Sequence, residues 1–344
     1  MRSFKIALKI LRTVGIFLLA VAVLSAGFVW CYLHGENFHY QDSRERDELA
    51  GSITVLVNGA SYAYMGIRPD ILDRYLGVRS YNLSGMLMTM EGRCALLEEE
   101  LSRNPVHTVV LEVSSDTLTR NRSEEGPHGD LPILAKLNNS GDRWRFLRRA
   151  FPISEYPDVY YDMVSCGVES AARFLTGTYS TRNRELARGF YATPKKNREI
   201  DTNYMEIYHV RSLPDEILPE NVAGLRRLLQ ICRDHGAKPV LITTPQSRYY
   251  NYLYDNLEYF QTWFSAFAAE EKVAYYNFNL AIEKVSTIPD SLYYDENHLS
   301  PEGAEIFSAL LARVLDAYFH GRDVSDWFYP SYADLEIAYP VWDA

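Results

Sequence analysis

The sequence predicts an α/β protein with a parallel central sheet that helices cover on both faces. Short apolar, β-branched runs recur along the chain, and a helical pattern follows most of them. Runs that are apolar at every residue, and not only at alternate residues, are typical of strands buried on both faces. Strands that alternate with amphipathic helices indicate a parallel sheet. The 344 residues are enough for a sizeable core.

The expected elements alternate in chain order. The expected strands are Ile53–Val57, Ser80–Asn82, Thr108–Val113, Pro239–Thr243 and Val273–Asn277. The expected helices are Pro69–Tyr75, Glu91–Arg103, Asn221–His235, Leu257–Glu271 and Ala304–Phe319. The expected helix Asn221–His235 is followed directly by Gly236, and glycine is favoured just beyond helix C-termini.

This alternation breaks between Thr117 and Pro219, in a long insertion rich in Tyr, Arg, Pro and Gly. The insertion is too long for a plain loop. One interpretation is a cap over the carboxyl ends of the strands, where α/β sheets bind ligands. The other is a helical decoration remote from the site. The tail, residues 321–344, is aromatic and is expected to pack on the domain surface; its rings are Trp327, Phe328, Tyr329, Tyr332, Tyr339 and Trp342.

The N-terminal segment contains a charge-free run, Val14–Leu33, that is about 20 residues long and can cross a bilayer as a helix. A cleaved signal peptide would be shorter and would end in small residues. The A-x-A match at 20–22 lies in the middle of the run, so we favour an uncleaved anchor. Lipid attachment at Cys31 is disfavoured because Trp30 precedes it. We expect residues 1–34 to be a cytoplasmic stub and anchor and residues 35–51 a polar linker.

The charges predict orientation and exclude some partners. Arg2, Lys5, Lys9 and Arg12 precede the apolar run, so the positive-inside rule leaves Met1 in the cytoplasm and the rest extracytoplasmic. The net charge is −10, which argues against nucleic-acid binding. The 4 cysteines are scattered without a CxxC pair, which argues against a disulfide scaffold or a thiolate metal site. We expect no cofactor.

The first segment that carries chemistry is the run NGAS, residues 58–61, directly after the first expected strand. A nucleophilic serine needs an exposed Oγ and nearby backbone N–H groups, which a strand-to-helix turn supplies. Gly59 allows the chain to turn tightly. Taken alone, the segment is more typical of an ordinary turn than of a nucleophile.

The second segment is DENHLSPEG, residues 295–303, just before the last expected helix. Ser300 can cap that helix, and proline suits its first position. Asp295 can accept the Nδ1–H of His298, which leaves Nε2 to act as a general base toward a serine. The alternatives are a surface turn with an incidental ion pair, or two metal ligands. No other His or carboxylate cluster has ligand spacing.

Together the two segments resemble the SGNH/GDSL hydrolase superfamily, from Ile53 to about Phe319 without the insertion. The resemblance implies a three-layer α/β/α, flavodoxin-like domain at about residues 52–320. It also implies that Ser61, Asp295 and His298 form a catalytic triad. The glycine of the family's second block matches Gly85 in YNLSG, residues 81–85. Its backbone N–H would help to form the oxyanion hole.

Two departures modify this expectation. The usual Gly-Asp-Ser is Gly-Ala-Ser here, a change at a position outside the triad. The third block, Gly-x-Asn-Asp, corresponds to VSSD at residues 113–116, so that Ser115 occupies the position of the Asn oxyanion donor. The implied oxyanion donors are therefore Ser61, Gly85 and Ser115.

The anchor, the stretch 59–69 and the Thr244-Pro245 pair are similar to a membrane-anchored branch related to DltD and alginate O-acetylation proteins. Members of that branch work beside a membrane-bound O-acyltransferase. We therefore expect an extracytoplasmic acyl-ester hydrolase or O-acyltransferase that acts on an acylated glycan or exported polymer. The alternative is a catalytically weak scaffold for such an acyltransferase. The triad is the same for hydrolysis and transfer, so the choice between them stays open.

Overall fold

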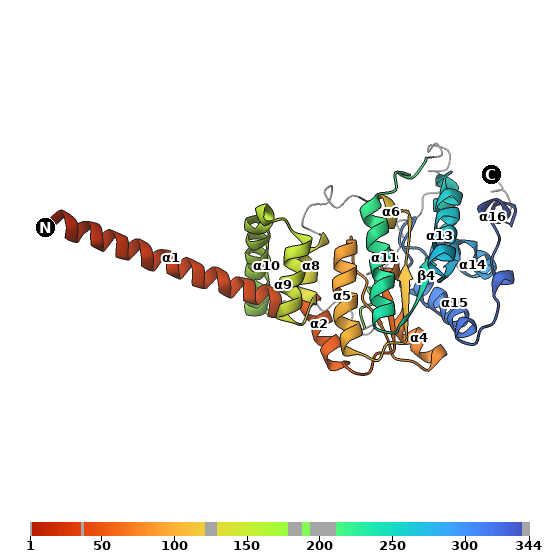
Figure 1. The fold of residues 1–344 in the computed structure, drawn as a ribbon, viewed down its shortest axis with the longest axis horizontal. Coiled ribbons are helices and arrows are strands. Elements are labelled where there is room, and N and C mark those ends of the chain that lie inside the picture. The colour runs from red at the N-terminus through yellow and green to blue at the C-terminus, as the bar shows by residue number, and fades with distance from the viewer. Residues whose placement is uncertain (1, 36–37, 121–128, 178–187, 193–210, 339–344) are drawn as a thin grey trace. The chain divides into compact units, whose positions relative to one another are not determined.

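The computed structural model describes residues 2–35, 38–120, 129–177, 188–192 and 211–338 (Figure 1). The chain forms two compact units. The first unit comprises residues 1–47 and 130–182, and the second comprises residues 48–129 and 183–344.

The second unit contains a five-stranded parallel sheet in the order β2-β1-β3-β4-β5. This is the flavodoxin-like order. Its strands are β1 (Val55–Asn58), β2 (Ser80–Asn82), β3 (Thr108–Glu112), β4 (Lys238–Thr243) and β5 (Ala274–Asn277). The predicted α/β class and parallel sheet are confirmed.

One face of the sheet packs on three helices, α5 (Met90–Arg103), α11 (Pro219–Asp234) and α13 (Leu257–Glu271). Leu56 of β1 and Val109 of β3 are register partners, and both side chains belong to this core. Side chains on one face of a strand alternate with those on the other, so the next residues point to the opposite face.

The opposite face packs on α4 (Pro69–Leu76) and α15 (Pro301–Phe319). The next register pair, Val57 and Val110, belongs to this second core. The sheet is therefore buried on both sides, and the unit has three layers. In the part of this unit that the structure describes, the other α-helices are α3 (Ser61–Gly66), α6 (Ser115–Thr119), α12 (Arg248–Leu253), α14 (Ile282–Thr287) and α16 (Tyr332–Ala338).

The edge strand β2 is covered by residues 188–192 of the insertion. The backbone N–H of Asn82 donates to the carbonyl of Arg188 at 3.0 Å, and the Arg188 guanidinium pairs with Asp73. Covering an edge strand removes a template for unwanted strand pairing. The described part of the aromatic tail packs on the surface of this unit, where the Phe328 ring stacks on Tyr276. The tail aromatics Tyr339 and Trp342 lie outside the described residues.

The first unit is helical and is built on the long N-terminal helix α1 (Arg2–His34). Its other helices are α2 (Phe38–Glu48), α8 (Leu131–Lys136), α9 (Ser140–Ala150) and α10 (Tyr156–Thr176). The buried Tyr32 hydroxyl of α1 donates to the carbonyl of Leu131 at 2.9 Å, and the Tyr160 hydroxyl of α10 donates to Ser25 at 2.8 Å. The end of α1 is thus part of a folded core.

Two expectations about domain organisation differ from the structure. The segment expected to be a polar linker, 35–51, contains the helix α2, because its polar side chains are paired inside the first unit. Asp42 forms a buried ion pair with Lys136 at 3.2 Å, and the buried Arg46 donates to the carbonyl of Lys136. The insertion 117–219 is also not one subdomain. Its helices α8 to α10 belong to the first unit, whereas its described residues 188–192 and 211–218 belong to the second.

Candidate active site

The serine segment lies at the carboxyl end of β1. Ser61 is the first residue of α3, and only Gly59 and Ala60 separate it from the strand. The Ala60 backbone N–H donates to Oε2 of Glu112, at the end of the neighbouring strand β3, at 2.9 Å. A Cβ on Gly59 would lie 2.6 Å from Cβ of Glu112 and 2.9 Å from Cβ of Ala63. Glycine is therefore required by close packing of the turn.

The histidine segment precedes α15, as predicted. Ser300 caps this helix by accepting from the Gly303 N–H at 3.2 Å, and Pro301 is its first residue. The Tyr294 N–H donates to the His298 carbonyl at 2.7 Å, which folds the loop back on itself. The loop that carries Asp295 and His298 is thus fixed at both ends.

The two segments meet through side chains. Nε2 of His298 lies 2.8 Å from Oγ of Ser61. Nδ1 of the same ring lies 3.0 Å from each carboxylate oxygen of Asp295. This arrangement assigns the Nδ1 proton to the Asp295 side and leaves the Nε2 lone pair facing the serine hydroxyl. Ser61, His298 and Asp295 form one continuous hydrogen-bonded chain.

Asp295 is held in its ionised form. Burial alone would raise the pKa of this carboxyl, but hydrogen bonds from His298 and from the backbone lower it below its ordinary value. The backbone contribution comes from the N–H groups of Asn297 and His298, at 3.1 and 2.8 Å. An ionised Asp295 can orient the imidazole and stabilise an imidazolium.

Tyr62, the residue after Ser61, supports the histidine. Its ring stacks on the His298 ring with centroids 5.1 Å apart. Its hydroxyl accepts from Nδ2 of Asn297 at 3.2 Å and donates to Asp116 at 3.4 Å. Burial, and then the Asp116 charge, raise the pKa of Tyr62 well above its usual value, so the phenol is neutral. The sequence analysis did not identify this residue.

A buried charged network lies beneath the serine turn. The Arg93 side chain, which is 2 % exposed, donates to the Asn58 side chain at 2.9 Å and to the Glu112 carbonyl at 2.7 Å. Burial raises the pKa of the Glu112 carboxyl, and the Arg93 charge partly offsets this. The sequence analysis missed this network, although a glutamate at the end of the apolar run TVVLEV was an available signal.

The two further oxyanion candidates occupy the expected loops. Gly85 lies in the buried loop after β2, and Ser115 is the first residue of α6, after β3. The Ser115 hydroxyl is hydrogen-bonded to the Tyr250 phenol. Among the described residues no hydrogen bond joins Gly85 or Ser115 to Ser61, and their part in an oxyanion hole stays a prediction. The Ala60 N–H is occupied by Glu112 and is not a free donor.

A metal site is the competing interpretation of Asp295 and His298. In the part of the chain that the structure describes, no three His, Cys, Asp or Glu side chains are grouped so that they could hold a metal ion. Both carboxylate oxygens of Asp295 face the imidazole. The local geometry is that of an oriented base.

Comparison with known proteins gives distant similarities only. No protein-family model and no curated protein sequence matches the chain. Among solved structures, it is similar to a lipolytic protein of the G-D-S-L family from Desulfitobacterium hafniense, with a TM-score of 0.38 and 10% identity over 76% of this chain and 98% of that one.

Two Bacteroides structures give comparable values. A GDSL-like lipase from Bacteroides thetaiotaomicron matches with a TM-score of 0.40 and 10% identity, over 82% of this chain and 98% of that one. A protein described as an acylhydrolase from Bacteroides fragilis matches with a TM-score of 0.40 and 11% identity, over 82% and 97%. At such distances the function has to be argued from the residues of the chain itself.

Proposed function

We propose that this protein is a serine-dependent acyl-ester enzyme, with Ser61 as nucleophile, His298 as general base and Asp295 as the residue that orients the base. The observation that carries the proposal is the unbroken chain of hydrogen bonds from Asp295 through His298 to Ser61. A base within hydrogen-bond reach of a hydroxyl, and itself oriented by a third group, is the signature of an activated nucleophile.

In the proposed reaction, His298 carries each proton that is transferred. His298 Nε2 takes the Ser61 proton as Oγ attacks the ester carbonyl, and the N–H groups of Ser61 and Gly85, with the Ser115 hydroxyl, hold the oxyanion. When the carbon–oxygen bond of the ester breaks, His298 returns the proton to the departing alcohol. An acceptor hydroxyl then loses its proton to His298 and attacks the acyl-Ser61 ester. As the bond between the acyl carbon and Ser61 Oγ breaks, His298 gives this proton to Oγ and the serine hydroxyl is restored.

The acceptor distinguishes two versions of this activity. With water the protein is an esterase, and with a sugar or polyol hydroxyl it is an O-acyltransferase. We propose an acylated glycan or exported polymer as the substrate and a membrane-bound O-acyltransferase as a partner. The resemblance of the N-terminal region and of the stretch 59–69 to a polymer-acylating branch supports this choice. A scaffold without activity would have no use for the oriented histidine.

We also propose that α1 is an uncleaved anchor with Met1 in the cytoplasm. Its segment Ile6–His34 is long and apolar enough to cross a bilayer. From Phe4 to Leu24 its large apolar side chains are exposed, whereas from Ser25 onward α10 begins to cover the helix. Exposed apolar surface of this extent is stable in lipid and not in water. Finding a mature chain that starts at or beyond Val23 would contradict the anchor.

The test of the activity is covalent labelling of the full chain with a fluorophosphonate, followed by peptide mapping. We expect the label on Ser61 and a loss of ester turnover on the order of 10⁴-fold or more in Ser61→Ala. Asp295→Asn should lose on the order of 10³- to 10⁴-fold with the fold intact. Ser265→Ala, at an exposed serine of α13, is the matched control. A Ser61→Ala protein with full turnover would show that the proposal is wrong.

A further inference from the structure

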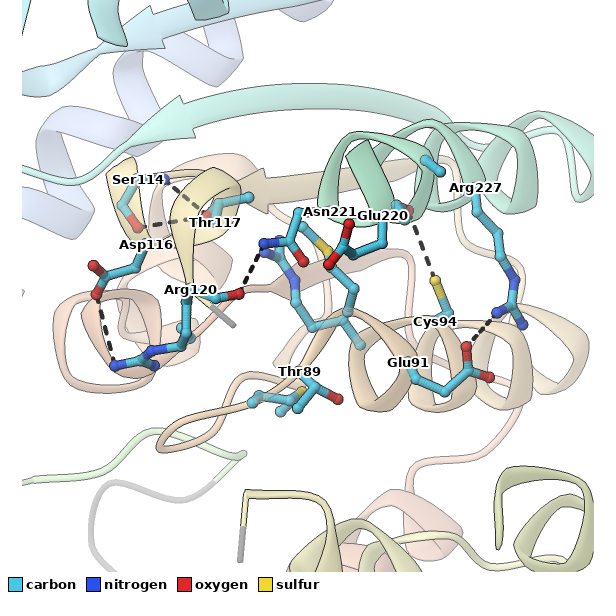
Figure 2. A pocket seen from close by; sticks show the side chains of 16 residues that line it. Thr89, Glu91, Cys94, Ser114, Asp116, Thr117, Arg120, Glu220, Asn221 and Arg227 are labelled. Carbon is cyan, nitrogen blue, oxygen red and sulfur yellow. Dashed lines mark hydrogen bonds and ion pairs between the residues drawn. The ribbon is translucent and has the colours of Figure 1, made fainter. Parts of the chain in front are cut away.

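A cavity of about 390 Å³ lies in the second unit among α5, α6 and α11 (Figure 2). Cavities that hold small molecules range from about 300 to 1,000 Å³. The cavity involves none of the triad side chains, and the activity proposed above does not explain it.

The cavity lies next to the serine turn. Ala60, whose carbonyl carbon is bonded to the nitrogen of Ser61, forms part of its wall. Asp116 also lines it, and the carboxylate of Asp116 lies 3.4 Å from the hydroxyl of Tyr62. Because the Tyr62 ring stacks on His298, this end of the cavity is connected to the catalytic groups by direct contacts. A group attached to the Ser61 oxygen would therefore be close to the cavity.

The cavity has a continuous set of apolar lining residues beside polar and charged ones. The apolar residues are Ala60, Met88, Met90, Cys94, Ala223 and Gly224, and the uncharged polar residues are Thr89, Ser114, Thr117 and Asn221. The Cys94 thiol is buried, and burial raises its pKa to about 12, so it is a neutral, weakly polar wall. Methionine side chains are flexible and adapt to irregular apolar ligands. Among the described residues no aromatic ring lines the cavity, so this part of the chain offers no flat face for stacking a sugar.

The charged residues that line the cavity neutralise one another. They are three carboxylates and three guanidinium groups, so their formal charges cancel. Arg227 pairs with Glu91 at 2.5 Å and Arg120 pairs with Asp116 at 3.8 Å, and the two pairs lie at opposite ends of the cavity (Figure 2). The two ion pairs leave the space between them to the apolar residues, so an uncharged chain can lie there without breaking either pair.

We propose that this cavity binds the acyl chain of the ester and that the acyl group is an unbranched chain of medium length, not acetyl. The inference rests on the proposed serine chemistry and names its substrate class, a medium-chain fatty acyl ester. The chain would run from the carbonyl carbon at Ser61 past Ala60, between α5 and α11. Each methylene that it buries leaves water for an apolar wall.

The test measures hydrolysis of p-nitrophenyl acetate, butyrate, hexanoate, octanoate and palmitate by the full chain in lipid nanodiscs. We expect kcat/KM to rise about fourfold per buried methylene until the cavity is filled, and to fall at palmitate. A wild-type protein that cleaves acetate as well as octanoate would overturn the proposal.

Filling the cavity gives the second measurement. Ala223→Phe, from the α11 side, and Cys94→Met, from the α5 side, should each lower the octanoate-to-acetate ratio of kcat/KM at least tenfold. Ala266→Phe makes the same change at an exposed alanine of α13 and should keep the wild-type ratio. A ratio unchanged in both filled variants, with melting temperatures that show folded protein, would also overturn the proposal.

The failure of the acyl site and the failure of the serine chemistry are distinguishable. If Ser61 is not labelled by a fluorophosphonate and no ester is cleaved, the serine chemistry itself is wrong, and the acyl site with it. If Ser61 is labelled and acetate is the best ester, only the acyl-chain assignment is wrong.

Discussion

Oε2 of Glu112 accepts a hydrogen bond of 2.9 Å from the backbone N–H of Ala60, so a side chain at the end of β3 fixes the turn that presents the serine on β1. The Arg93 guanidinium, on α5, lies beneath the same turn and bonds to both strand ends. The position of the serine is therefore determined by buried groups that do not react. Because Glu112 titrates, the stability of this turn depends on pH.

The first prediction concerns Glu112→Gln and the pH dependence of stability. Burial raises the pKa of Glu112 above the ordinary value of 4.5, so the folded state binds this proton more tightly than the unfolded state. This contribution to stability is therefore lost as pH rises from about 4.5 through the raised pKa. Glu112→Gln does not titrate. Its melting temperature should therefore rise relative to that of wild type as pH increases, because the uncharged amide keeps the neutral state that burial favours.

The melting temperature of Glu112→Gln, measured relative to wild type, should thus be higher at pH 8 than at pH 5. Glu216→Gln, at an exposed glutamate just before α11, is the control and should track wild type. A constant gap between Glu112→Gln and wild type across this range would refute the prediction.

Gly59→Ala should disrupt the serine turn by overpacking. The added methyl group would lie 2.6 Å from Cβ of Glu112, and backbone must shift to accommodate it. We expect a destabilisation of about 1–3 kcal/mol, measured by urea unfolding, together with a loss of ester turnover. Gly66→Ala is the matched control at the other end of α3, because its nearest neighbour would be at an ordinary 3.6 Å. Equal effects of the two changes would rule out this account.

Tyr62→Phe distinguishes the contribution of the tyrosine ring from that of its hydroxyl. The ring on His298 is kept, while the bonds to Asn297 and Asp116 are lost. Of these two bonds, the one with Asn297 holds the loop that carries His298. A neutral hydrogen bond of this kind is worth about 1 kcal/mol, so kcat/KM should fall about fivefold. Tyr62→Ala should cost more because it also removes the stacking. Tyr252→Phe, at an exposed tyrosine of α12, serves as the control, and a Tyr62→Phe protein indistinguishable from it would contradict the prediction.

Ser115→Ala tests the unusual third block. If the Ser115 hydroxyl donates to the oxyanion, its removal should lower kcat by on the order of ten- to a hundredfold with little change in KM, because that bond exists only in the transition state. Tyr250→Phe removes the phenol bonded to Ser115 without removing the donor and should have a smaller effect. A silent Ser115→Ala would mean that the oxyanion is held by backbone N–H groups alone.

The sheet and the two loops that carry Ser61 and His298 could be predicted from sequence because local signals determine them. β-branched runs such as TVVLE are continuous and apolar, and strands buried on both faces have this pattern. The α15 start was visible from Ser300 and Pro301, and it fixed where the histidine loop ends. The strands agree with prediction to within two residues at each end.

The first unit could not be predicted, because its helices pair with partners far away in the chain. α10 packs along α1 through contacts such as Tyr160 with Ser25, which are 135 positions apart. Gly167 lies directly against the backbone of Phe28, which leaves no room for a Cβ. The need for glycine at this position therefore depends on a residue far away in the chain. The Arg93–Glu112 network was missed for the same reason, since a buried charge pair leaves no periodic pattern.

The Ser61–His298 hydrogen bond joins residues that are 237 positions apart. Chains are synthesised from the N-terminus at about 5–20 residues per second, so more than about ten seconds separate the appearance of the serine from that of its histidine. Closing so long a loop depends on the docking of α15, the last long helix of the second unit. During synthesis the serine is therefore an ordinary hydroxyl, and a chain that ends before residue 298 lacks the base that the proposed reaction requires.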